Sequence, residues 1–550
     1  MTPPVSQPAA ARFTDVLTRE LPSGAGMLAR LAALPRRLTG WRADLLMLLA
    51  GAVAAAALPP VHAVPVLLVC IPCLLTAIRT TAGSRGAFRH GWWFGFGLNL
   101  IGLYWITEAI LVEAARFWWL VPLAVPALSA VLAVFVGIAT AVARRARVGW
   151  PRALALAGAW TLADLARQFV ATGFPWNPLG SVWAIPGWAG DLLIQPAAWV
   201  GVHGLTLATV LLAACPTLSQ RWRAAALAGF AVWVGGGVLR MGDIAAIHTP
   251  GPTVVVVQGN APQGQKWDRA LVTAIFERYL ALTADGLRGA NSGTAIVLWP
   301  ETAVPYLLQS DSAAREAIAS VTGRAVALIG GVRFDSDRRP RNSLFAITSD
   351  GIISQLYDKW HLVPFGEYQP NWLPLGVQLV PGGGFAAGPG PVTLSPPGIP
   401  SVGPLICYEA IFSGDVVDRD NRPAWLANAT NDAWFGNSTG PRQHLAAARL
   451  RAVEEGLPLV RAANTGISAI FDAYGHEISR LGMGQTGVLV TTLPPPLPAT
   501  PFARFGLLIS GFLAVASLAV GMWPSYARAR MRSAPDQTYY LLKSYFFTLI

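Results

Sequence analysis

Three short stretches of this chain each place a reactive side chain where a predicted strand ends. Glu301 follows the apolar run 295–299, Cys407 ends the run 401–407, and Lys359 lies between them in the sequence. A thiol attacks as its thiolate and needs a base, which a carboxylate in an apolar setting can supply. Acyl transfer passes through an oxyanion, which an ammonium group or a backbone N–H can stabilise. The three residue types together predict acyl transfer, with Cys407 as nucleophile, Glu301 as base and Lys359 as oxyanion stabiliser.

Each residue also has a plain structural explanation when it is considered alone. Glu301 fits a solvated loop, the polar stretch 357–368 fits a surface loop with incidental aromatic residues, and Cys407 fits a buried core position. One count argues against the surface-loop explanation, because the 41 lysines and arginines include three lysines, of which Lys359 is one. Cys407 is the one cysteine of four outside the long apolar runs, so it is either an inert core residue or a nucleophile.

The sequence predicts neither a metal ion nor an organic cofactor. The seven histidines are scattered, without an HExxH motif, and no P-loop or G-x-G-x-x-G motif follows a predicted strand. His361, His444 and His476 are interpreted as structural polar neighbours. Cys70 and Cys73 have metal or redox spacing, but they lie among Leu, Val and Ile without a second pair, so both are interpreted as buried small hydrophobic residues.

The composition indicates an integral membrane protein. Of 550 residues, 53% are hydrophobic and 13% are charged, whereas globular domains carry about 25% charged residues. The net charge of +12 does not indicate nucleic-acid binding, because most arginines flank apolar segments, where they anchor and orient membrane helices.

Eight apolar segments are predicted to be transmembrane helices. They lie near residues 44–58, 63–79, 90–111, 119–143, 151–171, 193–215, 224–240 and 505–523. With the N-terminus in the cytoplasm, sixteen arginines fall at the inward-facing segments and three at the short outward-facing ones, as the positive-inside rule requires. This orientation places the soluble segment 250–495 on the outer face of the membrane and the C-terminus in the cytoplasm.

The outer loop 172–192 is rich in Trp, Pro and Gly and contains neither Lys nor Arg. Two interpretations stay open at this point. The loop is either an aromatic belt at the membrane interface, or an ordered segment beneath the soluble domain that helps to hold lipid. In the second interpretation, Trp176 is the residue predicted to contact lipid.

The soluble segment alternates predicted strands and helices and is expected to form an α/β domain. Strands are predicted at 253–257, 295–299, 325–329, 343–348, 401–407, 424–429, 457–463 and 468–471, and helices at 267–288, 311–322 and 440–455. The run Thr253–Val257 is continuously apolar, which predicts a strand that is buried on both faces.

Four motifs carry a family resemblance. They are Trp-Pro-Glu at 299–301, YDKWHLVPFGEY at 357–368, Cys-Tyr-Glu at 407–409 and Phe-Pro-Trp at 174–176. With seven predicted spans before the soluble domain and one after it, the chain resembles the apolipoprotein N-acyltransferases, the membrane-embedded branch of the nitrilase superfamily. The resemblance extends over residues 43–523 and implies an αββα sandwich beside a membrane domain of eight transmembrane helices.

The resemblance also implies roles for single residues and a division of the chain. Glu301 is the expected general base, Lys359 the oxyanion stabiliser and Cys407 the acyl-carrying nucleophile; the expected supporting residues are Glu367, Tyr408 and Glu409. The expected parts are a cytoplasmic tail (1–42), a membrane domain with seven transmembrane helices (43–243), an extracytoplasmic nitrilase-like catalytic domain (244–495), an eighth transmembrane helix (504–523) and a second cytoplasmic tail (524–550).

The reaction implied by the resemblance is a ping-pong acyl transfer at the outer face of a bacterial inner membrane. Cys407 takes an acyl chain from a phospholipid, and the thioester then acylates the α-amino group of a diacylglyceryl-cysteine on an apolipoprotein, the last step of lipoprotein maturation. Three alternatives are a membrane-tethered amidase or nitrilase, a transporter and a pseudoenzyme scaffold. A tether needs one span, intramembrane ionisable residues are few, and the complete Glu–Lys–Cys set disfavours a scaffold.

Overall fold

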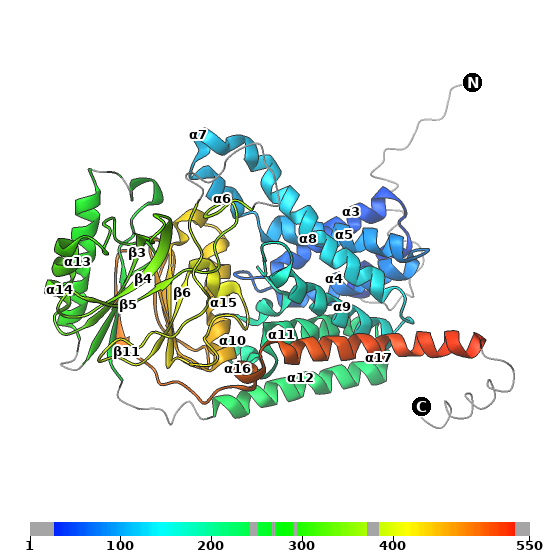
Figure 1. Ribbon diagram of the computed structural model, residues 1–550. Helices are drawn as coiled ribbons and strands as arrows, with labels where there is room; N and C mark the ends of the chain where they lie inside the picture. The colour runs from blue at the N-terminus through cyan, green and yellow to red at the C-terminus, as the bar shows by residue number, and fades with distance from the viewer. Residues whose placement is uncertain are drawn as a thin grey trace, which may run out of the picture.

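Figure 1 shows the computed structural model, which describes residues 27–242, 251–266, 268, 270–290, 294–370 and 384–533. Most of the first expected tail and the end of the second, 1–26 and 534–550, lie outside the described residues. The chain forms two parts that rest against each other. One is a bundle of helices from both ends of the chain, called the helical part below, and the other is a β-sandwich, called the catalytic domain after the role that the sequence predicts for it.

The helical part places a helix at each of the eight expected spans. These helices are α3 (Trp41–Ala54), α4 (Leu67–Thr80), α5 (Ser84–Gly102), α8 (Val121–Ala143), α9 (Trp150–Phe169), α11 (Ala197–Ala214), α12 (Gln220–Met241) and α17 (Leu507–Ser533). Helix α17 returns from the far end of the chain and packs against α9 and α11. The last expected span therefore belongs to the same bundle as the first seven.

Four helical segments among the described residues are long and apolar enough to cross a membrane. They lie at Ala114–Ala143, Ala197–Thr217, Gln220–Met241 and Leu507–Tyr526. Helices α3 and α4 have 14 residues each, against about 20 for a full span. Helices α5 and α9 are longer but contain arginines, and α9 also contains an aspartate. The structure thus shows several apolar helices, of which four meet the requirements of a span by themselves.

The catalytic domain contains two sheets that face each other. The six-stranded sheet has the order β11-β1-β2-β3-β4-β5, and the five-stranded sheet has the order β10-β9-β8-β7-β6. The first comprises β1 (Thr253–Gln258), β2 (Ala295–Leu298), β3 (Val326–Phe334), β4 (Pro340–Ile347), β5 (Ile353–Asp358) and β11 (Gly487–Thr492); the second comprises β6 (Val402–Ile406), β7 (Trp425–Thr430), β8 (Leu459–Ala463), β9 (Ser468–Phe471) and β10 (Glu477–Leu481).

Helices cover the outer face of each sheet, which completes the expected αββα sandwich. Helices α13 (Val272–Arg288) and α14 (Ser312–Thr322) cover the six-stranded sheet, and α15 (Gly440–Glu455) covers the five-stranded sheet. Strand β1 illustrates why the fold needs two cores. Val254 and Val256 pack between the sheets, whereas Val255 and Val257 pack under the helices, because successive side chains of a strand point to opposite faces.

The structure corrects several element boundaries. Strand β6 ends at Ile406, and Cys407 begins the short 3₁₀ helix η10 (Cys407–Ile411) rather than ending a strand. Strands β5, β10 and β11 were not expected from the sequence. Their sequences mix polar and apolar residues, and most of these residues are partly buried or exposed. They therefore lack the continuous apolar run that is typical of the central strands.

Helix α15 lies at the junction between the two parts. It packs against η10 in the catalytic domain and against α11 and α16 (Pro501–Phe505) of the helical part. The backbone N–H of Val202 on α11 donates to Glu454 Oε1 on α15 over 2.7 Å. The five-stranded half of the sandwich is therefore the half that rests on the helical part.

Candidate active site

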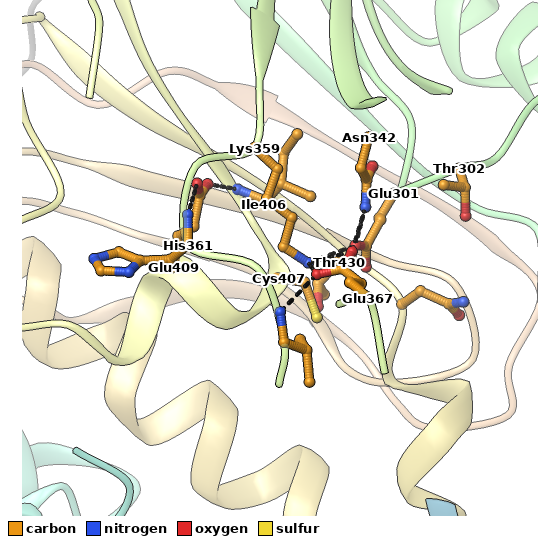
Figure 2. Close-up of polar contacts among 12 residues, drawn as sticks. Glu301, Thr302, Asn342, Lys359, His361, Glu367, Ile406, Cys407, Glu409 and Thr430 are labelled. Atoms are coloured by element: carbon orange, nitrogen blue, oxygen red, sulfur yellow. Dashed lines mark hydrogen bonds and ion pairs between the residues drawn. The ribbon is translucent and has the colours of Figure 1, made fainter. Parts of the chain in front are cut away.

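The structure brings Glu301, Lys359 and Cys407 together at one edge of the sandwich. Glu301 lies three residues beyond the end of β2, Lys359 directly follows β5, and Cys407 directly follows β6. Strands β2 and β5 run in the same direction within one sheet, so their carboxyl ends meet at the same edge. Figure 2 shows the Cys407 side chain directed toward the other two residues. All three are buried, with exposed fractions of 6%, 1% and 6%.

Lys359 is held between two carboxylates. Its Nζ donates to Glu301 Oε1 over 3.1 Å and to Glu367 Oε1 over 2.9 Å. The Asn342 side-chain amide, on β4, donates to the same two atoms over 2.7 and 3.0 Å, and the backbone N–H of Val363 donates to Glu367 Oε2 over 2.8 Å. The ammonium group is therefore fixed from several sides, as a preorganised electrostatic stabiliser must be.

The charges of this site act on the thiol in opposite directions. Burial opposes the charged form of Lys359, but Glu301 and Glu367 outweigh it and hold the Lys359 pKa well above its usual value, so the ammonium stays charged. Burial, and then the Glu301 carboxylate, raises the pKa of Cys407, whereas Lys359 lowers it. The resting thiol is therefore protonated, and a base must remove its proton before it can attack.

Cys407 occupies a strained turn between a strand and a helix. Its backbone φ of +51° lies in the left-handed region, which non-glycine residues seldom adopt and which is common at reactive sites. The Thr430 side chain lowers the pKa of Cys407 and so favours the thiolate. The geometry matches a nucleophile elbow, in which a sharp turn between a strand and a helix presents the reactive side chain.

Glu409 fixes the turn at Cys407 through hydrogen bonds. Its carboxylate accepts from the backbone N–H of Ile406 over 2.5 Å, from that of Trp360 over 2.8 Å and from the Tyr357 hydroxyl over 2.6 Å. Burial raises the pKa of Glu409 to about 7. This one side chain ties the turn at Cys407, after β6, to the segment that follows β5 and carries Lys359 (Figure 2).

Comparisons with known proteins cover both parts of the chain. Residues 50–215 match the apolipoprotein N-acyltransferase N-terminal domain, and residues 253–498 match the carbon-nitrogen hydrolase family. An apolipoprotein N-acyltransferase from Rhodopseudomonas palustris is 38% identical over 521 residues, or 89% of this chain and 96% of the relative. This chain belongs to the apolipoprotein N-acyltransferase family. The resemblance seen in the four sequence motifs is thereby confirmed.

Two further proteins are similar to this chain. An apolipoprotein N-acyltransferase from Bradyrhizobium diazoefficiens is 40% identical over 501 residues, which cover 85% of this chain and 92% of the relative. Among solved structures, Saccharomyces cerevisiae Nit3, a member of branch 10 of the nitrilase superfamily, aligns with 45% of this chain and 91% of its own, with 15% identity and a TM-score of 0.34.

The structure adds residues to the acyltransferase site that the sequence did not single out. Asn342 bridges the two carboxylates, and asparagine within a strand carries no sequence signal for such a role. Lys266 donates to the backbone oxygen of Glu301 over 3.1 Å and to the Thr302 hydroxyl over 2.6 Å. Burial lowers the pKa of Lys266 to about 8. The scarcity of lysine was a signal that pointed to Lys266 as much as to Lys359.

The loop 172–192 lies against the catalytic domain, as the second interpretation expected. Trp176 is 3% exposed, and its indole N–H donates to Gln443 Oε1 on α15 over 2.8 Å. The Tyr408 hydroxyl donates to the backbone oxygen of Gly173 over 2.9 Å. An aromatic belt alone does not account for these contacts, although Trp188 in the same loop is 68% exposed. Lipid contact by Trp176 stays a prediction.

The three histidines differ in their environments. His361 pairs with Asp415 over 3.3 Å, and His476 pairs with Asp191 over 2.8 Å. His444 is buried and contacts the backbone oxygen of Cys407 over 2.9 Å, so it touches the nucleophile turn itself. Within the described ranges, no group of three or more His, Cys, Asp or Glu side chains converges on a point that could hold a metal ion.

Proposed function

We propose that this chain transfers an acyl chain from a membrane phospholipid to the α-amino group of a diacylglyceryl-cysteine on an apolipoprotein, through a thioester on Cys407. One observation carries the proposal. A buried thiol lies at a strand-to-helix turn beside the Glu301–Lys359 pair, in a domain that rests on apolar helices. Both substrates are lipids, and exposing each CH₂ group to water costs about 0.8 kcal/mol, so the thiol must meet them at the membrane.

In the first step, Glu301 takes the Cys407 proton and the thiolate attacks the ester carbonyl carbon of the phospholipid. The carbonyl oxygen becomes an oxyanion, which the Lys359 ammonium and the backbone N–H of Tyr408 stabilise. The tetrahedral intermediate collapses, the C–O ester bond breaks, and the proton on Glu301 passes to the leaving alkoxide. The products are an acyl thioester on Cys407 and a lysophospholipid, and Glu301 is a carboxylate again.

In the second step, the α-amino group of the diacylglyceryl-cysteine attacks the thioester carbonyl. The same two donors stabilise the oxyanion, and the amine proton passes through Glu301 to the departing sulfur. An amide forms, the C–S bond breaks, and the thiol is regenerated. In both steps, Asn342 and Glu367 keep the Lys359 ammonium in place.

The membrane arrangement is part of the proposal. All eight helices at the predicted spans cross or enter the bilayer, with residues 43–243 as the membrane domain and 504–523 as the last span. The shorter helices α3 and α4 pack against the bundle through Met47, Ile71 and Leu74, which are fully buried. The catalytic domain, residues 244–495, faces outward, and both tails (1–42 and 524–550) lie in the cytoplasm.

The orientation is tested with a reporter enzyme fused after residue 350, between β4 and β5. We expect a reporter that requires the outer compartment to be active, because the arginine distribution places this segment outside. A fusion that reports the cytoplasm would overturn the orientation without affecting the chemistry.

The reaction is tested by asking which nucleophile discharges the thioester. Enzyme acylated by phospholipid is mixed with a diacylglyceryl-cysteine peptide or with buffer alone, and the acyl chain is followed by mass. We expect rapid transfer to the peptide amine and slow hydrolysis. If water discharges the enzyme as fast as the peptide does, the chain is a membrane-bound hydrolase and the transferase proposal fails.

A further inference from the structure

A buried chain of polar groups reaches the Cys407 backbone from behind. His444 on α15 places Nε2 2.9 Å from the Cys407 carbonyl oxygen and Nδ1 2.9 Å from Asp432 Oδ1. Arg461 on β8 donates from Nη2 to Asp432 Oδ2 over 2.7 Å. Asp432, His444 and Arg461 are each exposed by 1% or less. The chain Arg461–Asp432–His444 thus ends on the residue that carries the nucleophile.

The chemistry of the acceptors fixes the proton on one ring nitrogen. A carbonyl oxygen can only accept, so the contact with Cys407 requires a hydrogen on His444 Nε2. Nδ1 lies between Asp432 Oδ1 and Arg461 Nη2, which is 3.2 Å away, so the ring is held on that side too. Burial favours protonated Asp432, but Arg461 and His444 outweigh it and lower its pKa to about 2. The middle member of the chain is therefore a carboxylate.

The bond to Cys407 determines where the next N–H points. In a trans peptide, the C=O of Cys407 and the N–H of Tyr408 lie in one plane and point in opposite directions. Because the C=O is directed at His444, the Tyr408 N–H is directed away from it. Tyr408 is the second residue of η10, and the first N–H groups of a helix have no partner within that helix. This N–H is therefore free to bind an oxyanion.

We propose that His444 is a positioning residue for acyl transfer, which holds the Cys407–Tyr408 peptide plane so that the Tyr408 N–H meets the oxyanion. The inference rests on the proposed function, because it concerns the oxyanion of that reaction. His444 does not touch the substrate. It acts through the backbone of Cys407, whose left-handed φ of +51° needs support from its surroundings.

The cost of this polar chain supports a role beyond packing. Well-packed apolar residues often stabilise a core as well as a buried ion pair does, because the pair loses its hydration. The backbone beside Asp432 also leaves space for this polar chain. A Cβ atom at Gly466 would lie 2.3 Å from Asp432 Oδ2, so the position must lack a side chain for Asp432 to reach Arg461. The structure thus accommodates a charged chain that ends on the nucleophile.

Two substitutions separate positioning from simple packing. His444→Gln keeps an N–H donor at about the position of Nε2, facing the Cys407 carbonyl. His444→Asn keeps a polar group at about the position of Nδ1, facing Asp432, and loses the Cys407 contact. If His444 only provides a polar partner for Asp432, His444→Asn should be the more active of the two variants. If His444 positions the Cys407 peptide, His444→Gln should be the more active one. His476→Asn is the matched control, since His476 also pairs with a buried aspartate, Asp191.

Each full-length variant is measured in two single-turnover reactions of Cys407. One is acylation by a phospholipid in mixed micelles, and the other is alkylation by iodoacetamide. Both need the thiolate, but alkylation passes through no oxyanion. Loss of one oxyanion-hole donor typically costs about 10²–10³ in rate, so we expect His444→Asn to slow acylation by at least about tenfold. We expect its alkylation rate to stay near that of the native enzyme.

The activities of the variants distinguish a positioning role of His444 from a packing role. Rescue of acylation by His444→Gln supports the positioning role. Equal losses in acylation and alkylation, or better function of Asn than of Gln, would overturn it in favour of a packing role. If the His444 variants do not fold, Asp432→Asn tests the same claim, since loosening the ring must slow acylation more than alkylation. If the native enzyme forms no acyl adduct at all, the proposed function fails, and the positioning role of His444 fails with it.

Discussion

The two sheets of the catalytic domain contribute different things to the site. The six-stranded sheet supplies the charged pair and the amide that holds it, because Glu301, Lys359 and Asn342 all come from its strands or their ends. The five-stranded sheet supplies the thiol, and it is also the sheet whose covering helix rests on the helical part. Tyr408 and Ile411 of the nucleophile turn belong to the same apolar cluster as Leu103, Trp105, Leu132 and Trp176 of the helical part.

This difference separates two tasks. In the proposed reaction, the half that bears the thiol fixes the reactive atom relative to the membrane, where both lipid substrates would be met. The half that bears the charges would take the proton and supply the Lys359 ammonium to the oxyanion. Changes in the charged half should therefore affect chemistry with any acyl donor, whereas changes at the junction with the helical part should affect lipid donors above all.

The largest effect is expected from Glu301→Gln. General acid–base catalysis contributes about 10²–10⁴ in rate, and the glutamine keeps the size of the side chain but cannot take the thiol proton. Single-turnover acylation of Cys407 by phospholipid, followed by mass, should slow by that amount while lipid binding persists. The exposed Glu316→Gln on α14 is the control. Acylation of Glu301→Gln at the native rate would remove Glu301 from the base role.

Lys359→Arg should cost somewhat less, about 10²–10³ in the same assay. The ammonium fits between Glu301, Glu367 and Asn342, and a planar guanidinium on a longer side chain places its charge differently. Arginine therefore keeps the charge but not its position. Acylation at the native rate with arginine would show that charge alone is sufficient and that the geometry of this pocket matters little.

Trp176→Phe tests the other half at its junction with the helical part. Phenylalanine keeps an aromatic ring and loses the indole N–H bond to Gln443, and a small shift of reacting groups can cost up to about 10²-fold in rate. We expect roughly tenfold slower turnover with phospholipid and a smaller change with a short water-soluble thioester donor. Trp188→Phe, in the exposed part of the same loop, should leave both rates unchanged. Equal losses with the two donors would contradict the proposed division of tasks.

The smallest effect is a shift in pH dependence. The Glu301 carboxylate raises the pKa of Cys407 and the Lys359 ammonium lowers it. Removal of the carboxylate in Glu301→Gln should therefore move the pH profile of iodoacetamide alkylation toward lower pH, because the thiolate forms more readily. Lys359→Met should move the profile the other way. A shift of both variants in one direction would show that the two charges do not act on the thiol as described.

The sequence predicted the central parts of this molecule better than its edges. The continuous run of valines in β1 identified a strand buried on both faces, and the reactive residues at strand ends pointed to one site. Strands β5 and β10 were not predicted, because they are only partly buried and polar and apolar residues do not alternate regularly in their sequences. Asn342 and His444 act through contacts between strands and helices that meet only in the folded domain. No local sequence pattern could therefore predict the role of Asn342 or the contact of His444 with Cys407.

The central claim is that the acyl chain rests on Cys407. The most direct measurement is the intact mass of the native enzyme and of Cys407→Ala after incubation with phospholipid, with the adduct mapped by peptide mass. We expect one acyl chain on Cys407 in the native enzyme, its removal by neutral hydroxylamine, and no adduct in Cys407→Ala. A full acyl adduct in Cys407→Ala would contradict the whole account.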